Sequence, residues 1–235
     1  MHPIRSLLSL TALSALALAA VVPHNCRDTN NQVSAAGESL EQAAGLARNL
    51  VKNTNVGTFM TVMNSARQEG RLEGYPFGSM DYYVDDCDQP GTPLMLLSSL
   101  QINIKNAETN NKVSLAIRKL PAEGEKGNPM VDPRVTLMGH LVPVDKEKHA
   151  RAEACFVAKH PEAKWWLPGA GFHDFKWYNM EIDDIYYIGG FGGIHYIGWI
   201  DVATYYGADN LSSTKLMLDE ADLESLSSSL LLQRQ

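Results

Sequence analysis

Two short runs near the middle of the chain contain the residue types best suited to binding a small anionic ligand. Residues 74–79 place a proline, a glycine and a serine hydroxyl on an extended segment. Residues 98–106 place hydroxyls, amides and one ammonium where a helix is expected to begin. Free backbone N–H groups at the start of a helix attract phosphate, and a lysine adds a point charge. The two runs could therefore hold an anionic planar ligand such as flavin mononucleotide (FMN), or they could be the remains of a pocket that has lost it.

Taken singly, these residues have simpler structural interpretations. Pro76 cannot donate to a strand ladder, which predicts an edge strand or a bulge, and Gly78 allows another backbone or a flat ring to come close. Ser98 could be an ordinary helix cap, and Lys105 an exposed lysine. For each residue alone the structural interpretation is favoured.

Other kinds of chemistry have weaker support in the sequence. The glycines of residues 189–193 resemble a dinucleotide-binding loop, but position six is His195 and strand-like residues follow. The histidines include no HExxH pair, and none stands at zinc spacing with cysteines, so no metal site is predicted. Ser79 and Ser98 lack the setting of a nucleophile elbow, so no catalytic residue is predicted.

The N-terminal residues have the pattern of a secretory signal peptide. His2 and Arg5 precede an apolar run that ends in small residues, which places a signal peptide at residues 1–20. The run is short for a bilayer, so no membrane span is expected in the mature chain. The protein is therefore expected in the secretory pathway, with an extracellular or vacuolar/lysosomal destination. Asn210 begins the one N-glycosylation sequon, and we expect it to be glycosylated.

Charge and cysteine content limit the functions further. The net charge of −7, with no long basic stripe, argues against a nucleic-acid partner. Three cysteines in a secreted chain allow one disulfide at most. A Cys26–Cys87 bridge is the pairing considered, because both residues fall in expected loops. Cys155 is expected to be a small buried residue on the apolar face of a helix.

Hydrophobic periodicity predicts a mainly β (α+β) protein, a β-barrel of antiparallel strands with flanking helices. Residues 21–37 are expected to form a flexible lead-in, residues 38–206 the barrel domain, and residues 207–235 a C-terminal loop and helix or tail. A helix is expected to start at Ser39, and another to run over residues 145–159 with Asp145 as its cap and Ala150, Ala154, Val157 and Ala158 on its apolar face. The strands are expected at residues 56–63, 75–84, 92–97, 113–117, 134–144, 172–188 and 194–200, with helical turns at 100–106 and a last helix at 219–232.

Several of these runs also occur in a known order. Residues 74–79, 98–106, 113–117, 134–139 and 158–161 follow one another as in the flavin-binding split-barrel superfamily of pyridoxamine phosphate oxidase, which the chain resembles over residues 38–206. Within that superfamily, the signal peptide and the aromatic residues 165–192 are similar to the secreted CREG glycoproteins. The resemblance implies a split β-barrel that pairs into a homodimer, with flavin sites at the dimer interface in the members that bind flavin.

The same resemblance assigns roles to individual residues. Lining of the flavin ring is implied for Pro76, Phe77, Gly78 and Ser79, and a phosphate-side position for Ser98, Lys105 and Asn106. Flavin-binding relatives have a His-Thr-Arg-Asn run where this chain has Asn103-Ile104-Lys105-Asn106, so the bidentate guanidinium contact with phosphate is lost. We therefore expect a non-catalytic, CREG-like protein that binds a ligand or partner, with a degraded flavin site and no cofactor. The alternative is an FMN-dependent oxidoreductase of the pyridoxamine phosphate oxidase-like type.

Overall fold

The computed structural model describes residues 37–208, except 67, 122–123, 125, 172–173 and 192–194. The predicted signal peptide, Cys26, Asn210 and the helix expected at 219–232 lie outside the described residues. The helices of the described part of the chain are all too short or too polar to span a bilayer.

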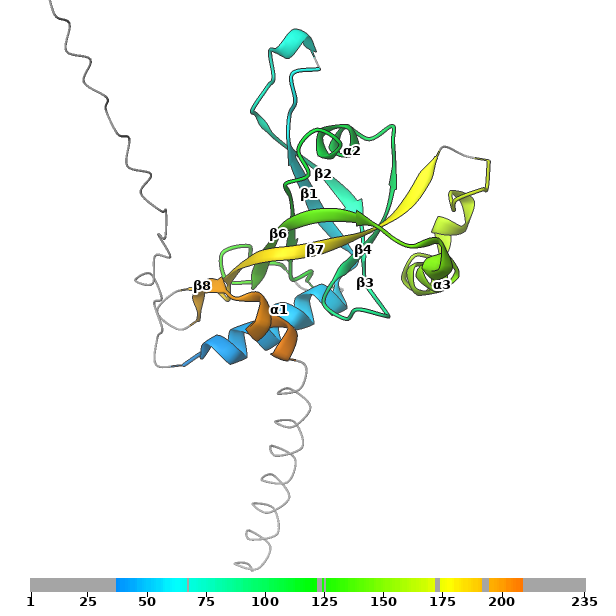
Figure 1. The fold of residues 1–235 in the computed structure, drawn as a ribbon. Coiled ribbons are helices and arrows are strands. Elements are labelled where there is room, and N and C mark those ends of the chain that lie inside the picture. The colour runs from blue at the N-terminus through cyan, green and yellow to red at the C-terminus, as the bar shows by residue number, and fades with distance from the viewer. Residues whose placement is uncertain are drawn as a thin grey trace, which may run out of the picture. The chain divides into compact units, whose positions relative to one another are not determined.

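The described residues form one curled antiparallel sheet with a few flanking helices (Figure 1). The sheet has eight strands in the order β2-β1-β5-β6-β7-β4-β3, and β8 also pairs with β7. The strands are β1 (Val56–Val62), β2 (Pro76–Tyr82), β3 (Val84–Asp85), β4 (Pro93–Ser98), β5 (Val113–Arg118), β6 (Arg134–Pro143), β7 (Phe175–Ile188) and β8 (Ile197–Ile200). The predicted fold class, a mainly β (α+β) barrel of antiparallel strands with flanking helices, is confirmed, and the curled sheet forms a half-barrel. The strand expected at residues 75–84 is divided into β2 and β3.

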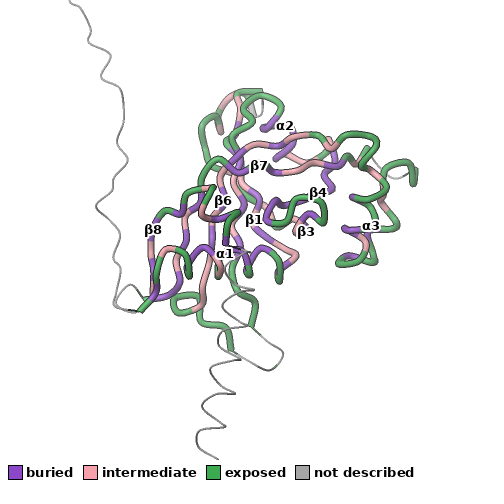
Figure 2. The backbone as a smooth tube through the Cα atoms, turned by 60° about the horizontal axis from the view of Figure 1, so that its bottom comes forward, coloured by how far each residue is buried: buried purple, intermediate pink, exposed green. Residues whose placement is uncertain are grey.

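Side chains alternate between the two faces of the sheet, as β geometry requires. In β1, β5 and β6 every second residue is buried, and Figure 2 shows this as alternating colours along β1 and β6. The buried residues form the core, and the residues between them form a second face, which we call the outward face. It includes Val56, Thr58, Met60, Gly78, Met80, Ala116, Arg118, Arg134, Thr136, Tyr186, Ile188 and Trp199.

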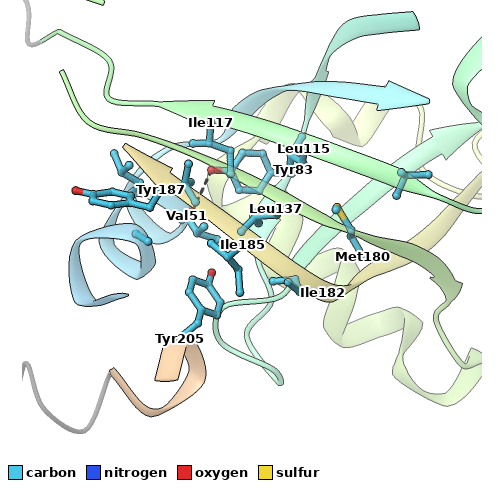
Figure 3. Packing of buried hydrophobic residues seen from close by; sticks show 14 of the residues in the cluster. Val51, Tyr83, Leu115, Ile117, Leu137, Met180, Ile182, Ile185, Tyr187 and Tyr205 are labelled. Carbon is cyan, nitrogen blue, oxygen red and sulfur yellow. Dashed lines mark hydrogen bonds between the residues drawn. The ribbon is translucent and has the colours of Figure 1, made fainter. Parts of the chain in front are cut away.

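Helix α1 (Leu40–Asn53) packs on the core side of the sheet, and its start agrees with the prediction. Ser39 accepts a bond from the backbone N–H of Gln42, whose side chain accepts from the N–H of Ser39, so both halves of a capping box are present. Three alanines and Val51 on one stripe are buried, and their small size allows close approach of the helix. The core around Val51 joins α1 to β5, β6 and β7; within it the Tyr83 hydroxyl donates to the Val51 carbonyl at 3.2 Å (Figure 3).

Helix α3 (His149–Lys159) differs from the prediction in the face that it buries. Ala150, Ala154 and Ala158 are exposed, whereas Ala152, Cys155 and Phe156 are buried. The Phe156 ring packs edge-on against Trp177 of β7 at 5.3 Å, so one large aromatic side chain decides the orientation. Asp145 precedes a short 3₁₀ turn, η2 (Lys146–Lys148), and makes no side-chain cap bond.

The disulfide also differs from the prediction. Cys87 pairs with Cys155, across 68 residues of sequence, and the expected Cys26–Cys87 bridge is wrong. Cys155 is buried as expected, but as half of a disulfide rather than as a free thiol. The bridge ties α3 to the segment between β3 and β4, which sequence spacing alone could not reveal.

The remaining helical segments are short. They are α2 (Ile102–Ala107), η1 (Gln68–Gly70), η3 (Pro161–Trp165) and an unpredicted helix over residues 202–208. That last helix lies beside α1 (Figure 1), where the Arg48 guanidinium stands 5.2 Å from the centre of the Tyr205 ring. The Tyr205 hydroxyl donates to the Gly91 carbonyl at 2.9 Å, which joins this helix to the β3–β4 connection.

Candidate functional site

The structure brings the two sequence runs together at one end of the sheet. Strand β2 contains Pro76, Phe77, Gly78 and Ser79, and α2 contains Lys105 and Asn106. A hydrogen bond of 2.8 Å from Asn103 Nδ2 of α2 to Ser79 Oγ joins the two elements directly. The residues that the resemblance assigned to ring and phosphate therefore do lie side by side.

Strand β2 is an edge strand, which accounts for its proline. It pairs with β1 on one side, and among the described strands it has no partner on the other. Pro76 and Gly78 lie on the outward face, and Phe77 and Ser79 face the other way. Gly78 stands opposite Met60, and a Cβ there would lie 3.1 Å from side-chain atoms of Met60 and Thr58. A side chain at this position would therefore require Met60 and Thr58 to shift by a few tenths of an ångström.

The hydroxyl of Ser79 is already engaged within the protein. It donates to Asp81 Oδ2 at 3.0 Å and accepts from Asn103 at 2.8 Å. Gln101 Nε2 donates to the other Asp81 oxygen at 2.6 Å. Burial raises the pKa of Asp81, and the hydrogen bonds from Ser79, Gln101 and Asn103 act in the opposite direction.

The two asparagines of the phosphate-side run point into the protein. Asn103 Nδ2 donates to the Phe59 carbonyl at 3.1 Å, and Asn103 Oδ1 accepts from Thr61 Oγ1 at 2.8 Å. Asn106 Nδ2 donates to Thr61 Oγ1 at 3.0 Å, while Asn106 Oδ1 is buried with no hydrogen-bond partner among the described residues. Both asparagines are almost fully buried. Their amides hold α2 against β1 and β2.

Ser98 and Lys105 have different surroundings. Ser98 is buried, and its hydroxyl accepts from the N–H of Leu100 at 3.2 Å, which closes the turn before α2. The N-cap of α2 is Gln101 rather than Ser98. Lys105 is half-buried, and no described acceptor lies within bonding distance of its ammonium. Of the polar groups predicted on the phosphate side, the Lys105 ammonium is the one left available.

Three residues of this network were not singled out from the sequence. Asp81 could have been found, because it alternates with Ser79 along β2 and so shares its face. Gln101 and Thr61 gave no such signal, because their contacts depend on how α2 docks on β1.

A second candidate site lies on the outward face, where the structure has a hollow of about 220 Å³. We call it the outward hollow. Its lining combines small and apolar side chains with three hydroxyls and two guanidinium groups, and it includes Thr58, Ala116, Arg118, Arg134, Thr136, Tyr186 and Ile188. Sequence reasoning missed it, although the period of two along β5 and β6 places both arginines on one face.

His195, which follows the glycine run of residues 189–193, is oriented by a buried carboxylate. Its Nδ1 lies 3.0 Å from Glu38 Oε2, which also accepts from the N–H of Tyr196 at 3.2 Å. Glu38 Oε1 and the Tyr187 hydroxyl are buried and have no hydrogen-bond partner among the described residues. Burial, and to a smaller degree the charge of Glu38, raise the pKa of Tyr187 far above its usual value. Within the described ranges no three His, Cys, Asp or Glu side chains come together as metal ligands.

Comparison with solved structures defines the class of protein. The chain superposes on a heme binding protein from Mycobacterium smegmatis with a TM-score of 0.57 and 23% identity, over 70% of this chain and 60% of that one. Atu2129 from Agrobacterium tumefaciens, of unknown function, gives a TM-score of 0.53 and 22% identity over the same shares. These likenesses identify the chain as a split-barrel protein.

The sequence then places the chain within that class. Residues 38–207 match the family model described as CREG, beta-barrel, so the chain belongs to the CREG β-barrel family. Protein CREG1 of Gallus gallus is 27% identical over 164 residues, which cover 66% of this chain and 81% of that protein. The non-canonical heme oxygenase HOZ of Arabidopsis thaliana, a chloroplastic protein, is 35% identical over 120 residues. The match covers 51% of this chain and only 34% of the Arabidopsis relative.

Proposed function

We propose that this CREG-family chain is a binding protein of the secretory pathway that acts as a homodimer and does not perform flavin chemistry. The observation that supports it best is the inward orientation of Asn103 and Asn106, together with the engaged hydroxyl of Ser79. The His-to-Asn and Arg-to-Lys differences remove about two charge-assisted hydrogen bonds to phosphate, each worth about 1.5–3 kcal/mol. Their loss weakens FMN binding by roughly a hundredfold or more.

Retention of flavin tests this proposal directly. The purified full-length protein is mixed with FMN and desalted, and its visible spectrum is recorded. We expect no stoichiometric flavin band. A retained band would overturn the proposal in favour of the FMN-dependent oxidoreductase. In that case Lys105→Ala should abolish the band if Lys105 holds the phosphate, and Lys112→Ala, an exposed lysine just beyond α2, is the matched control.

The secretory route is supported by two independent features. One is the signal-peptide pattern of residues 1–20, and the other is the Cys87–Cys155 disulfide, because disulfides persist mainly in oxidising compartments. When the chain is expressed in a secreting eukaryotic host, we expect the protein in the culture medium or in the vacuole or lysosome. Its mass should fall on deglycosylation. Asn210→Gln should abolish that fall. A cytosolic, unmodified product would contradict this part of the proposal.

Homodimerisation is supported by the outward face. Met80 is 68% exposed and Trp199 is 49% exposed, and they stand among further apolar residues on that face. Apolar sheet surface of this kind is typical of a protein–protein interface. Light scattering should therefore give twice the mass of the chain, and a monomeric mass would contradict a shared interface.

A heme-type ligand is the second candidate for the bound molecule. The Arabidopsis relative is named a heme oxygenase, and it is the more similar of the two relatives over the region it matches. In this chain the outward hollow has the fitting donor set, because it pairs an apolar floor with two guanidinium groups. Titration with hemin tests it: a saturable Soret band supports this candidate, and an unchanged spectrum of free hemin contradicts it.

A further inference from the structure

We propose that Arg118 and Arg134 form a carboxylate-recognition site for a ligand with a flat apolar body, such as a porphyrin dicarboxylate. The inference rests on the proposal that the chain is a binding protein, and it names the class of ligand and the residues that would recognise its charge.

The first argument is the register of the two strands. Arg118 of β5 and Arg134 of β6 are direct cross-strand partners, and both belong to the outward face. Like charges directly opposite each other destabilise a sheet. An anion between the two guanidinium groups would remove this repulsion, so the pair is better suited to the bound state than to the free one.

The second argument is the anchoring of Arg134. Its Nη1 donates to the carbonyl of Pro129 at 2.7 Å and to that of Asp132 at 3.5 Å. A guanidinium has five N–H donors in a fixed plane, so this anchoring leaves donors free and oriented. Arg118 is exposed, and no described carboxylate lies within ion-pair distance of it. Neither charge is neutralised by a described carboxylate.

The third argument is the surface beside the arginines. Ala116 and Ile188 give the outward hollow an apolar floor, and Thr58, Thr136 and Tyr186 add hydroxyls. A mostly apolar lining with a few polar groups is the usual composition of a ligand site. The Tyr186 and Trp199 rings stand edge to face with centres 5.0 Å apart, which extends the aromatic surface away from the arginines.

The size of the hollow sets how the ligand would lie. A volume of about 220 Å³ is below the roughly 300–1,000 Å³ of ordinary ligand pockets. The hollow therefore takes the anionic end of the ligand, and the apolar body lies along the outward face toward Tyr186 and Trp199. A second copy of the chain over this face would cover the part of the ligand left exposed.

Metal-free protoporphyrin IX is the probe that separates carboxylate recognition from iron ligation. Its fluorescence is titrated with the full-length wild type, Arg118→Gln, Arg134→Gln and the matched control Lys119→Gln, an exposed neighbour of Arg118. We expect saturable binding by the wild type and the control, and at least tenfold weaker binding by each arginine variant. The dimethyl ester, which has no carboxylates, should bind all four proteins weakly and equally.

The arms of the experiment give distinct outcomes. Equal affinity of Arg118→Gln and wild type overturns the inference, and Arg118 is exposed, so this variant is expected to fold. Binding of hemin but not of the metal-free diacid also overturns it, because iron would then be recognised. Oleate has an extended apolar body instead of a flat one. If it competes for the site as strongly as a porphyrin does, the part of the inference that specifies a flat body is overturned. None of these results bears on flavin retention, so the proposed function fails or stands separately.

Discussion

The prediction that tests the interpretation of α2 most directly is the substitution Asn103→Ala. The change removes two donated bonds, to the Phe59 carbonyl and Ser79 Oγ, and one accepted bond, from Thr61 Oγ1. A hydrogen bond contributes about 0.5–1.5 kcal/mol net, and a buried partner left unsatisfied costs about 1–3 kcal/mol. Because the Phe59 carbonyl and the Thr61 hydroxyl lie inside the protein, we expect a loss of about 2–4 kcal/mol in the free energy of unfolding.

Urea unfolding followed by far-UV circular dichroism measures this loss, with the disulfide kept intact. Asn110→Ala is the matched control, because Asn110 is an exposed asparagine just beyond α2, and we expect a change within about 0.5 kcal/mol. The double variant Asn103→Ala/Thr61→Val should lose clearly less than the sum of the single variants, since the two side chains share one bond. A loss below about 0.5 kcal/mol for Asn103→Ala would refute the view that its amide is consumed in holding α2 on the sheet. Asn103 would then be free to face a ligand.

Three further predictions concern charge, the disulfide and the outward face. Because burial raises the pKa of Asp81 above 3.8, its contribution to stability is fully present below pH 3.8 and is lost as the pH rises through the higher folded-state pKa. Asp81→Asn should therefore be at least as stable as wild type at pH 7 and lose this advantage toward pH 3.8. Urea midpoints of the variant and of wild type that change in parallel across this pH range would contradict the prediction. Cys87→Ala/Cys155→Ala should lower the free energy of unfolding by about 3–4 kcal/mol for a bridge spanning 68 residues, whereas Cys26→Ala should leave it unchanged. Non-reducing peptide mapping that finds Cys26 in the bridge would overturn this pairing. Met80→Lys should shift the protein from dimer to monomer in light scattering, while Leu46→Lys, at an exposed apolar position on α1, should not. An unchanged mass for Met80→Lys would remove the outward face as the interface.

The sequence by itself determined the elements whose signals are local. Ser39 and Gln42 form a capping box within four residues, and the alanines that follow repeat at helical spacing, so the start and buried face of α1 were predictable. Alternation of apolar and polar residues likewise identified the strands, and Pro76 indicated an edge strand. The order of the motifs indicated the split barrel, because that order follows the fold and does not depend on any single contact.

Tertiary structure alone decided the contacts between residues far apart in the chain. Spacing could not choose Cys87–Cys155 over Cys26–Cys87, because a disulfide depends on which loops the sheet brings together. The face of α3 was set by the packing of Phe156 on Trp177, against the alanine pattern of the helix itself. The inward amides of Asn103 and Asn106 have the same origin. An asparagine satisfies its hydrogen bonds wherever partners lie, and Thr61, Phe59 and Ser79 reach it only after β1, β2 and α2 have assembled.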